Sequence, residues 1–375
     1  MPEVAILIVS RNIGGLERRW AALYRYLSRQ RLPYRLTFIV SRMQTAALVN
    51  KYVQPSHDAL CREEFGVSGN ILQRPAFLRP VWRLLDYICL IKLLMTGFRK
   101  KRFAAAHFVT PSSLMFSPLV KSGLKVMSVA NSGNVEALAK SPVFRRALRA
   151  GFHVDHLSAD LCRRVSALQL ASGKRLHTSP CSFADYGETD VRDKKPWMVF
   201  VSRLIQGKGI EILLASLPEI LGRCPHLKVK IVGEGALYEQ IGRSVGRMSG
   251  SDRVWLGFRK EPIDILRHSR IFLSLQDREN YPSQSLLEAM ACGNAVIATD
   301  VGLTRKIVDE NVGVLIDRDS NQLTAAVCQL AADDALADRL GKMARERVSK
   351  EHSPARYFTY LDDIYRHGDE LPAEA

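Results

Sequence analysis

Short apolar runs alternate with amphipathic stretches along the whole chain. In the first half, the runs that predict strands are residues 4–9, 36–40, 103–109, 124–129 and 153–157. In the second half, they are residues 197–201, 227–232, 254–256, 271–275, 295–298 and 312–316. Residues 16–27 carry apolar side chains at helical spacing, and other helical stretches separate the remaining runs. Strands that alternate with helices predict parallel sheets covered by helices on both faces.

The two series of runs predict two domains. A chain of 375 residues is too long for one ordinary core, and the polar segment GETDVRDKKP separates the series. We expect an α/β protein with two doubly wound, Rossmann-like domains that face each other across a cleft, with ligands at the carboxyl ends of the strands. The first domain takes residues 1–186, a linker 187–195 and the second domain 196–355. A C-terminal helix and tail over residues 356–375 can pack back on the first domain.

The composition indicates a globular protein of the cytoplasm. Apolar residues make up 47% of the chain and charged residues 25%. No apolar run is long enough for a membrane-spanning helix, and the N-terminus MPEVAILIVSRN lacks the basic start of a signal peptide. Seven cysteines without a C-x-x-C pair predict reduced thiols and argue against a zinc site.

The positive charge of the chain lies entirely in its first half. Residues 1–190 hold 28 basic and 12 acidic residues, whereas residues 191–375 hold 26 of each, so the net charge of +16 belongs to the first half. Such an imbalance predicts an anionic partner for that half: membrane phospholipid, nucleic acid or an anionic substrate. We find no nucleic-acid reading element in the sequence and expect no nucleic-acid partner.

Basic residues and glycines follow two strands of the second domain. Arg203 and Lys208 come after the run 197–201, just before a helical stretch, which is a favourable place for an anion. Gly233 and Gly235 follow the next strand, where a backbone without side chains can approach a ligand closely.

A third junction is ENYPSQSLLEAMACGNAVIATD, residues 279–300. A helix begins within it and a Cys-Gly pair ends that helix before a buried strand. Glu279 and Glu288 bracket the polar start of the helix, and their carboxylates can accept hydrogen bonds from sugar hydroxyl groups. The polar residues between them that we include as donor-binding candidates are Ser283, Gln284 and Ser285. Together, the three junctions suit a nucleotide diphosphate that carries a sugar.

The second half resembles the nucleotide-sugar domain of the large retaining glycosyltransferase family usually numbered four, whose two-domain fold is called GT-B. The matching segments are VSRLIQGKG, IVGEG, VWLGF, SRIFLSLQDRENYPSQSLLEAMACGNAVIATDVG and VGVLI, which span residues 197–316. The first half resembles the acceptor domain more loosely, through a strand followed by IGGLERRW. The resemblance implies sugar transfer from a nucleotide diphosphate donor with retained configuration, without a metal or other cofactor.

The resemblance also implies roles for individual residues. Arg203 and Lys208 grip the diphosphate, Glu288 binds the ribose and Glu279 lies beside the donor sugar. The family usually has seven residues between its two glutamates, whereas eight lie between Glu279 and Glu288. Either the loop has one extra residue and Glu279 keeps its role, or Asn280, which stands in the usual register, takes that role over. We favour Glu279, because Glu279-Asn280-Tyr281-Pro282 still reads like the start of the family's loop.

On the acceptor side, the resemblance implies a histidine after the strand that ends near residue 129. Asn131 stands at that place here, and His107, at another strand end, is an alternative polar group, although a histidine there is more often structural. The turn Gly14-Gly15 is expected to bring backbone close to the donor from the first domain.

Three other interpretations fit the sequence less well. A nicotinamide-dependent oxidoreductase is the rival enzyme, but IGGLE replaces the G-x-G-x-x-G that would open its first unit. A nucleotide-sugar or nucleic-acid binding protein without catalysis is a further alternative. The acid pair Asp317 and Asp319 has the spacing of metal ligands, but it follows the last strand, away from the proposed site. We expect no metal.

Residues 79–103, RPVWRLLDYICLIKLLMTGFRKKRF, carry apolar residues at helical spacing and end in Arg99, Lys100, Lys101 and Arg102. One interpretation is a core helix with a solvated basic end, and the other is a helix at an anionic membrane surface. The sequence therefore predicts a glycosyltransferase, peripheral on the inner face of the membrane, that uses a lipid-linked or polysaccharide acceptor.

Overall fold

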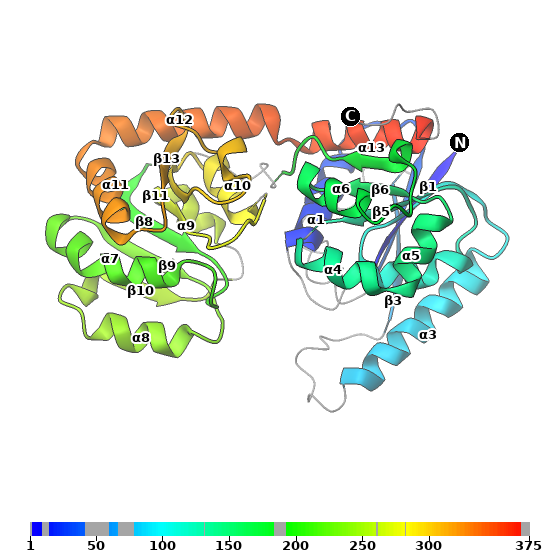
Figure 1. Cartoon of the computed structure of the whole chain (residues 1–375), viewed down its shortest axis with the longest axis horizontal. Coiled ribbons are helices and arrows are strands. Elements are labelled where there is room, and N and C mark those ends of the chain that lie inside the picture. Colours follow the sequence, from blue (N-terminus) through cyan, green and yellow to red (C-terminus); the bar gives the residue numbers. More distant parts are fainter. Residues whose placement is uncertain are drawn as a thin grey trace. The chain divides into compact units, whose positions relative to one another are not determined.

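The chain divides into two compact units, each built on its own sheet (Figure 1). The computed structural model describes residues 2–9, 15–41, 60–66, 79–130, 132–183, 193–259, 262–281 and 283–368. Unit 1 comprises Met1–Ser182 and Pro354–Ala375, and unit 2 comprises Phe183–Ser353. The chain therefore leaves unit 1 after its last strand and returns to it with the C-terminal helix.

The described residues of unit 1 form a seven-stranded parallel sheet in the order β3-β2-β1-β4-β5-β6-β7. Its strands are β1 (Glu3–Ile8), β2 (Arg35–Ser41), β3 (Leu60–Phe65), β4 (Phe103–Phe108), β5 (Ser122–Val129), β6 (His153–His156) and β7 (Leu176–Thr178). Its helices are α1 (Gly15–Leu27), α3 (Arg79–Gly97), α4 (Ser132–Lys140), α5 (Pro142–Arg149), α6 (Ala159–Ser166) and α13 (Pro354–His367), with 3-10 turns η3 (Pro111–Leu119) and η4 (Gly173–Arg175).

The two strands that the pattern did not predict, β3 and β7, are the edges of this sheet. Inner strands such as β1, EVAILI, are buried along almost their whole length because helices cover both faces. An edge strand pairs on one side only, so β3 tolerates the charged residues in LCREEF, while β7 has only three residues. Neither segment therefore has the apolar run that marks a buried strand.

The described residues of unit 2 form a six-stranded parallel sheet in the order β10-β9-β8-β11-β12-β13. Its strands are β8 (Lys195–Val201), β9 (Lys228–Val232), β10 (Val254–Gly257), β11 (Ser269–Ser274), β12 (Ala295–Thr299) and β13 (Gly313–Ile316). Its helices are α7 (Ile210–Arg223), α8 (Tyr238–Gly246), α9 (Ile263–His268), α10 (Gln284–Ala291), α11 (Ser320–Ala332) and α12 (Asp334–Glu351), with 3-10 turns η5 (Ser251–Arg253) and η6 (Thr304–Lys306).

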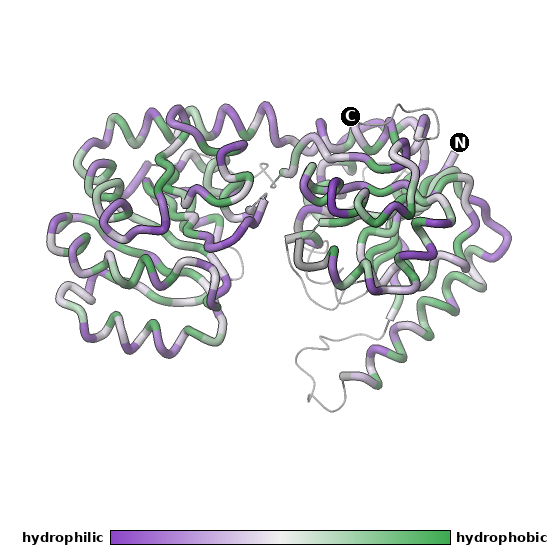
Figure 2. The backbone as a smooth tube through the Cα atoms, viewed as in Figure 1, coloured by the Kyte–Doolittle hydropathy of each residue, from purple (hydrophilic) through white to green (hydrophobic). Residues whose placement is uncertain are grey.

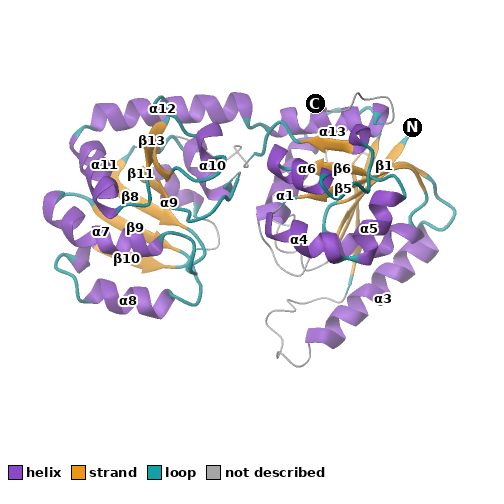
Figure 3. Ribbon diagram, in the orientation of Figure 1, coloured by secondary structure: helices purple, strands orange, loops and turns teal. Residues whose placement is uncertain are grey.

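Helices lie on both faces of each sheet (Figure 3), so the predicted fold of two doubly wound, Rossmann-like domains is confirmed. In unit 2, one apolar cluster packs α7 and α11 against one face of the sheet, and another packs α10 and part of α12 against the opposite face. None of the helices in the described parts of the chain combines the length and apolar character needed to cross a membrane.

The strand order of each sheet reverses once. In unit 2 the chain passes from β8 outward to β10, then returns to β11 on the other side of β8. In unit 1 the same reversal lies between β1 and β4. Ligands of open parallel sheets bind at the carboxyl ends of the strands at such a reversal, which directs attention to the loops after β8 and β11.

Candidate functional site

The loop after β8 packs closely against the residue that follows β11. Gly207 and Gly209 adopt left-handed backbone conformations, with φ of +83° and +76°. A Cβ atom on Gly209 would lie 1.6 Å from the carbonyl oxygen of Leu275, the residue that follows β11. Only glycine fits at this position, where the loop turns into α7. The sequence Gly-Lys-Gly therefore fixes Lys208 at the reversal of the strand order.

The loop after β9 is joined to the same structure by backbone hydrogen bonds. The amide of Leu204 donates to the carbonyl of Glu234 at 2.8 Å, and a Cβ atom on Gly235 would lie 2.3 Å from the carbonyl oxygen of Leu204. On Gly233, a Cβ atom would lie 1.9 Å from the carbonyl oxygen of Ser202. The structure thus uses Gly233 and Gly235 for close contact between the loops after β8 and β9, whereas the sequence analysis expected them to approach a ligand.

Arg203 and Lys208 form a pair of cations at this site. Arg203 is exposed and Lys208 is half-buried. Burial lowers the pKa of Lys208 below its usual value, and the positive charge of Arg203 lowers it further, while Asp277 acts in the opposite direction. Within the described residues, neither side chain has an ion pair. Like charges held together at a strand end form a site for an anion.

Gln276 and Asp277, which follow β11, belong to this site but were not predicted. The Nζ atom of Lys208 donates to Oε1 of Gln276 at 2.9 Å, and the amide of Asp277 donates to the carbonyl of Gly207 at 3.3 Å. The exposed fraction of Gln276 is 7%. A polar pair directly after the apolar strand FLSL is the signal in the sequence that could have identified them.

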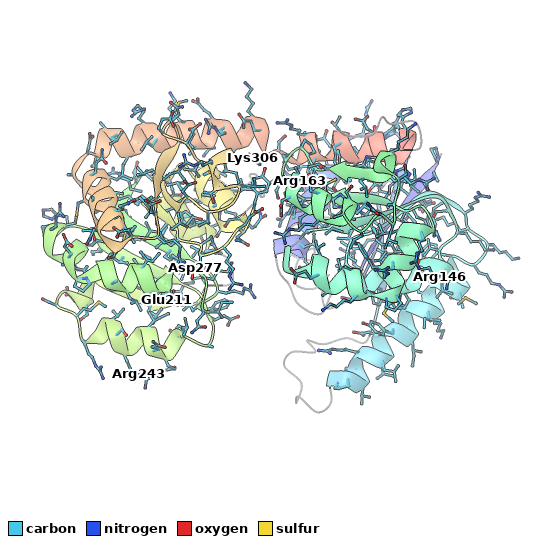
Figure 4. The ribbon with its side chains drawn as sticks, in the orientation of Figure 1. Arg146, Arg163, Glu211, Arg243, Asp277 and Lys306 are labelled. Atoms are coloured by element: carbon cyan, nitrogen blue, oxygen red, sulfur yellow. The ribbon has the colours of Figure 1, made fainter. Side chains whose placement is uncertain are left out.

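The segment Asp317–Asp319 lies closer to this site than the sequence indicated. The guanidinium of Arg318 forms an ion pair with the carboxylate of Asp277 at 3.1 Å, so the loop after β13 reaches the loop after β11. The prediction that Asp317 and Asp319 lie away from the site was therefore wrong. Figure 4 labels Asp277 in unit 2. Asp319 caps α11 by accepting from the amide of Gln322 at 2.8 Å. Among the residues described, no cluster of histidine, cysteine or acidic side chains is arranged to hold a metal ion.

The predicted helix in ENYPSQSLLEAMACG is confirmed as α10, and its first turn is open. Ser283 is the N-cap residue, but its side chain makes no capping hydrogen bond and instead lies 3.3 Å from the hydroxyl of Ser285. Gln284 and Ser285 are half-buried in the first turn. The amide groups at the start of a helix have no partners within the helix, so this end of α10 can accept an anion.

Glu279 lies at the ends of β11 and β12. A Cβ atom on Gly302, which follows β12, would lie 2.6 Å from Cβ and 2.8 Å from Oε2 of Glu279. The carboxylate therefore rests against a glycine with φ of +55°. Asn280 is exposed, whereas Glu279 and Glu288 are half-buried. Glu288 follows Gln284 by four residues and so shares its face of α10.

His107 lies in the interior of unit 1 and not at an acceptor site. It is fully buried on β4, and its Nε2 and Nδ1 atoms lie 2.8 Å from the hydroxyl of Ser128 and 2.7 Å from that of Tyr365. Ser128 donates to Asp155 at 2.9 Å, so its hydroxyl accepts the proton of Nε2 and the Tyr365 hydroxyl donates to Nδ1. Burial lowers the pKa of His107 to about 4. His107 therefore has no free nitrogen for an acceptor.

The same network fastens α13 to the sheet of unit 1. Asp155 on β6 accepts hydrogen bonds from the hydroxyls of Tyr357 and Tyr360, each at 3.0 Å. Arg19 on α1 donates to the Tyr357 hydroxyl at 3.1 Å and its guanidinium lies 4.7 Å from the centre of that ring.

Three other residues of unit 1 were predicted to belong to the site. Gly15 is the first residue of α1, and Gly14 and Asn131 lie outside the described residues.

The sequence of unit 2 is similar to that of known glycosyltransferases. Residues 195–333 match the family model described as Glycosyl transferases group 1. The phosphatidyl-myo-inositol mannosyltransferase of Mycolicibacterium smegmatis is 28% identical over 204 residues, which span 51% of this chain and 52% of that protein. The alpha-maltose-1-phosphate synthase of Mycobacterium tuberculosis is 30% identical over 196 residues, 48% of this chain and 50% of that protein. The chain thus spans about half the length of the curated relatives it matches.

The fold is similar to that of solved structures over nearly the whole chain. HepE of Anabaena, in complex with UDP and glucose, superposes with a TM-score of 0.69 at 15% identity, over 97% of this chain and 99% of that chain. At this identity the likeness shows the fold alone, two Rossmann-like units of the GT-B type. Together, the matches show that residues 195–333 are similar in sequence to group 1 glycosyltransferases and that the chain has the two-unit fold of its structural neighbours.

Proposed function

We propose that this chain is a glycosyltransferase that moves a sugar from a nucleotide diphosphate donor to a lipid-linked or polysaccharide acceptor. The observation that carries the proposal is the pair Arg203 and Lys208, two neighbouring cations at the strand reversal of unit 2. Within the described residues neither cation forms an ion pair, and both lie inside the segment that matches group 1 glycosyltransferases. The diphosphate of a nucleotide sugar would supply the negative charge that pairs with these two cations.

Each polar group of the site has a proposed role toward the donor. Arg203 and Lys208 neutralise the diphosphate, and the open first turn of α10, with Ser283, Gln284 and Ser285, offers amide and side-chain donors to the phosphate oxygens. The carboxylate of Glu288 accepts hydrogen bonds from ribose hydroxyls, as the resemblance implies. Gly233 and Gly235 contribute indirectly, because they let the loops after β8 and β9 meet.

Glu279 is the group that we assign to the donor sugar. Its carboxylate lies against Gly302, so it is held where the ends of β11 and β12 meet. The neighbouring Asn280 is exposed and is the alternative group for the same contact. Gly14 and Gly15 are proposed to approach the donor from unit 1, since backbone without a Cβ atom can come close to phosphates.

The chemistry follows from the charges at the site. As the bond between the anomeric carbon and the diphosphate oxygen breaks, negative charge grows on the leaving diphosphate. Arg203 and Lys208 stabilise this charge, in the place that a metal takes in other folds, so we expect neither metal nor cofactor. With retention, the acceptor oxygen attaches on the face that the diphosphate leaves. A phosphate oxygen of the donor takes the hydroxyl proton, and a nucleoside diphosphate is released.

The acceptor is proposed to bind at unit 1, near an anionic membrane surface. The whole net charge of +16 lies in residues 1–190. Phosphatidylinositol, the lipid in the name of the mycolicibacterial relative, is an anionic acceptor of this kind. A lipid-linked acceptor on the inner face of the membrane therefore fits the charge distribution better than a free neutral sugar.

A screen of nucleotide sugars tests the proposal. The purified chain is mixed with UDP-, GDP- and ADP-sugars, and its thermal unfolding is recorded. A ligand at a hundred times its dissociation constant stabilises the folded state by about 2.7 kcal/mol, so the correct donor produces a clear rise in Tm. The anomeric configuration of the product, read by NMR, then tests retention. A chain that none of these donors stabilises would contradict the proposal.

A further inference from the structure

Helix α3 has two apolar faces that meet different surroundings. On one face, Leu90 and Leu94 are fully buried in the core of unit 1, and Tyr87 and Leu93 pack against that core. The other face carries the exposed Lys92 and six exposed apolar residues, with exposed fractions as follows: Val81 52%, Leu84 60%, Leu85 38%, Ile88 51%, Ile91 42% and Met95 44%. Figure 1 shows α3 on the outside of unit 1, and Figure 2 shows hydrophobic residues along its length.

The six exposed apolar residues, here called the α3 stripe, are spaced as one side of a helix. At about 100° per residue, they occupy a sector of roughly 120° centred on Ile88, opposite the buried residues. Single exposed hydrophobic residues are common on soluble proteins. In the described residues, however, six of the ten large hydrophobic side chains that are exposed lie on this one helix. Such a concentration marks an interaction surface.

Exposed cations lie at the C-terminal end of the stripe. Arg99, Lys100 and Arg102 directly follow the helix, are exposed, and have no ion pair among the described residues. Lys101 behaves differently: its Nζ atom lies 2.6 Å from a carboxylate oxygen of Glu3. Lysine and arginine beside an apolar helix face are the arrangement that suits the boundary between lipid headgroups and acyl chains.

We infer that the α3 stripe is the surface by which unit 1 docks on an anionic lipid bilayer, with Arg99, Lys100 and Arg102 against the headgroups. The buried face of α3 fixes the helix to unit 1, so only the stripe can enter the membrane interface. A second copy of the chain is a poorer occupant, because two strongly basic halves would be brought together. The inference rests on the proposed function in one respect, because a membrane-bound acceptor is the reason why unit 1 would dock on a bilayer. The α3 stripe itself lies outside the donor site.

Sedimentation with lipid vesicles tests the inference. The intact chain is mixed at low salt with vesicles of phosphatidylcholine, with or without phosphatidylglycerol. We expect binding to the anionic vesicles that falls as salt rises, because the attraction is screened within a Debye length. The triple variant Leu84→Gln, Ile88→Gln, Ile91→Gln should bind at least about tenfold more weakly. The matched control is Met343→Gln, an exposed apolar residue of α12 (39%), which should bind like the unchanged chain.

A second variant separates charge from apolar contact. Replacing Arg99, Lys100 and Arg102 with Gln should weaken binding to anionic vesicles by roughly a hundredfold, since each basic residue contributes about fivefold. Nucleotide-sugar affinity should remain unchanged in both variants, so a failure of docking is distinguishable from a failure of the donor site. Absence of vesicle binding at low salt overturns the inference. So does self-association that the stripe variant abolishes, which would assign the stripe to a second copy.

Discussion

Lys208 and Gln276 are joined across the point where the strand order of unit 2 reverses. The Nζ atom of Lys208, in the loop after β8, donates to Oε1 of Gln276, in the loop after β11, at 2.9 Å. The buried amide of Gln276 thus holds a cation at the carboxyl edge of the sheet without neutralising it. A neutral partner leaves the full positive charge of the ammonium available to an anionic ligand.

The close contact between Gly209 and Leu275 predicts that one added methyl group lowers the stability of the chain strongly. Gly209→Ala places a Cβ atom 1.6 Å from the Leu275 carbonyl oxygen and in a left-handed backbone conformation. Left-handed backbone costs about 1–2 kcal/mol and overpacking about 1–3 kcal/mol, so unfolding free energy should fall by roughly 2–5 kcal/mol. Urea unfolding of the variant and of the unchanged chain measures this difference in unfolding free energy. Gly222→Ala, within α7 and with open space around it, is the control and should raise stability by up to about 1 kcal/mol.

The sequence predicted the inner strands of both sheets because burial on two faces demands continuous apolar runs. It did not predict β3 and β7, since an edge strand needs no such run. At the site, the pattern made Arg203, Lys208 and the start of α10 candidates because of their positions relative to strands. It gave no sign that Gly233 and Gly235 serve a contact between loops, because a contact between distant segments leaves no local pattern.

His107 illustrates a second reason why the sequence was insufficient. A histidine at a strand end has the same local pattern whether it faces a ligand or the interior. Its two partners, Ser128 and Tyr365, come from positions 21 and 258 residues away, and only the fold brings them together. Gln276 and Arg318 are comparable cases at the other site, since each acts through a contact with a different loop.

The stability of unit 1 should fall when the pH is lowered from about 6.5 to about 4. Burial lowers the pKa of His107, His156 and His177 from 6.5 to about 4. In this window the unfolded chain binds protons that the folded chain does not, so the stability that is present above pH 6.5 is lost as the pH falls. Each histidine contributes at most on the order of 3 kcal/mol.

Urea unfolding at a series of pH values measures this loss. His107→Gln should give a shallower dependence of unfolding free energy on pH between 6.5 and 4. His226→Gln, at an exposed position of unit 2, is the control and should keep the original slope. An unaltered slope in the His107 variant would show that its burial does not govern the acid sensitivity of the chain.

Three variants distinguish the roles of the polar residues around α10. Glu288→Gln keeps the shape of the side chain and removes its charge, so we expect a large loss of transfer activity with little change in Tm. If Glu279 contacts the donor sugar, Glu279→Gln should lower activity strongly while Asn280→Ala retains it. Initial rates with the donor found in the screen provide the measurement. If Asn280→Ala loses transfer activity while Glu279→Gln retains it, the contact with the donor sugar belongs to Asn280 and not to Glu279.

The affinity of the chain for nucleoside diphosphates tests the central claim most directly. UDP, GDP and ADP are titrated into the unchanged chain and into Arg203→Ala, Lys208→Ala and Lys228→Ala, the last an exposed lysine at the opposite end of the sheet. A charge-assisted contact contributes roughly 1.5–3 kcal/mol, so Arg203→Ala and Lys208→Ala should each weaken binding at least about tenfold. Lys228→Ala should bind as the unchanged chain does. Equal affinity in all four proteins would contradict the assignment of Arg203 and Lys208 to the diphosphate.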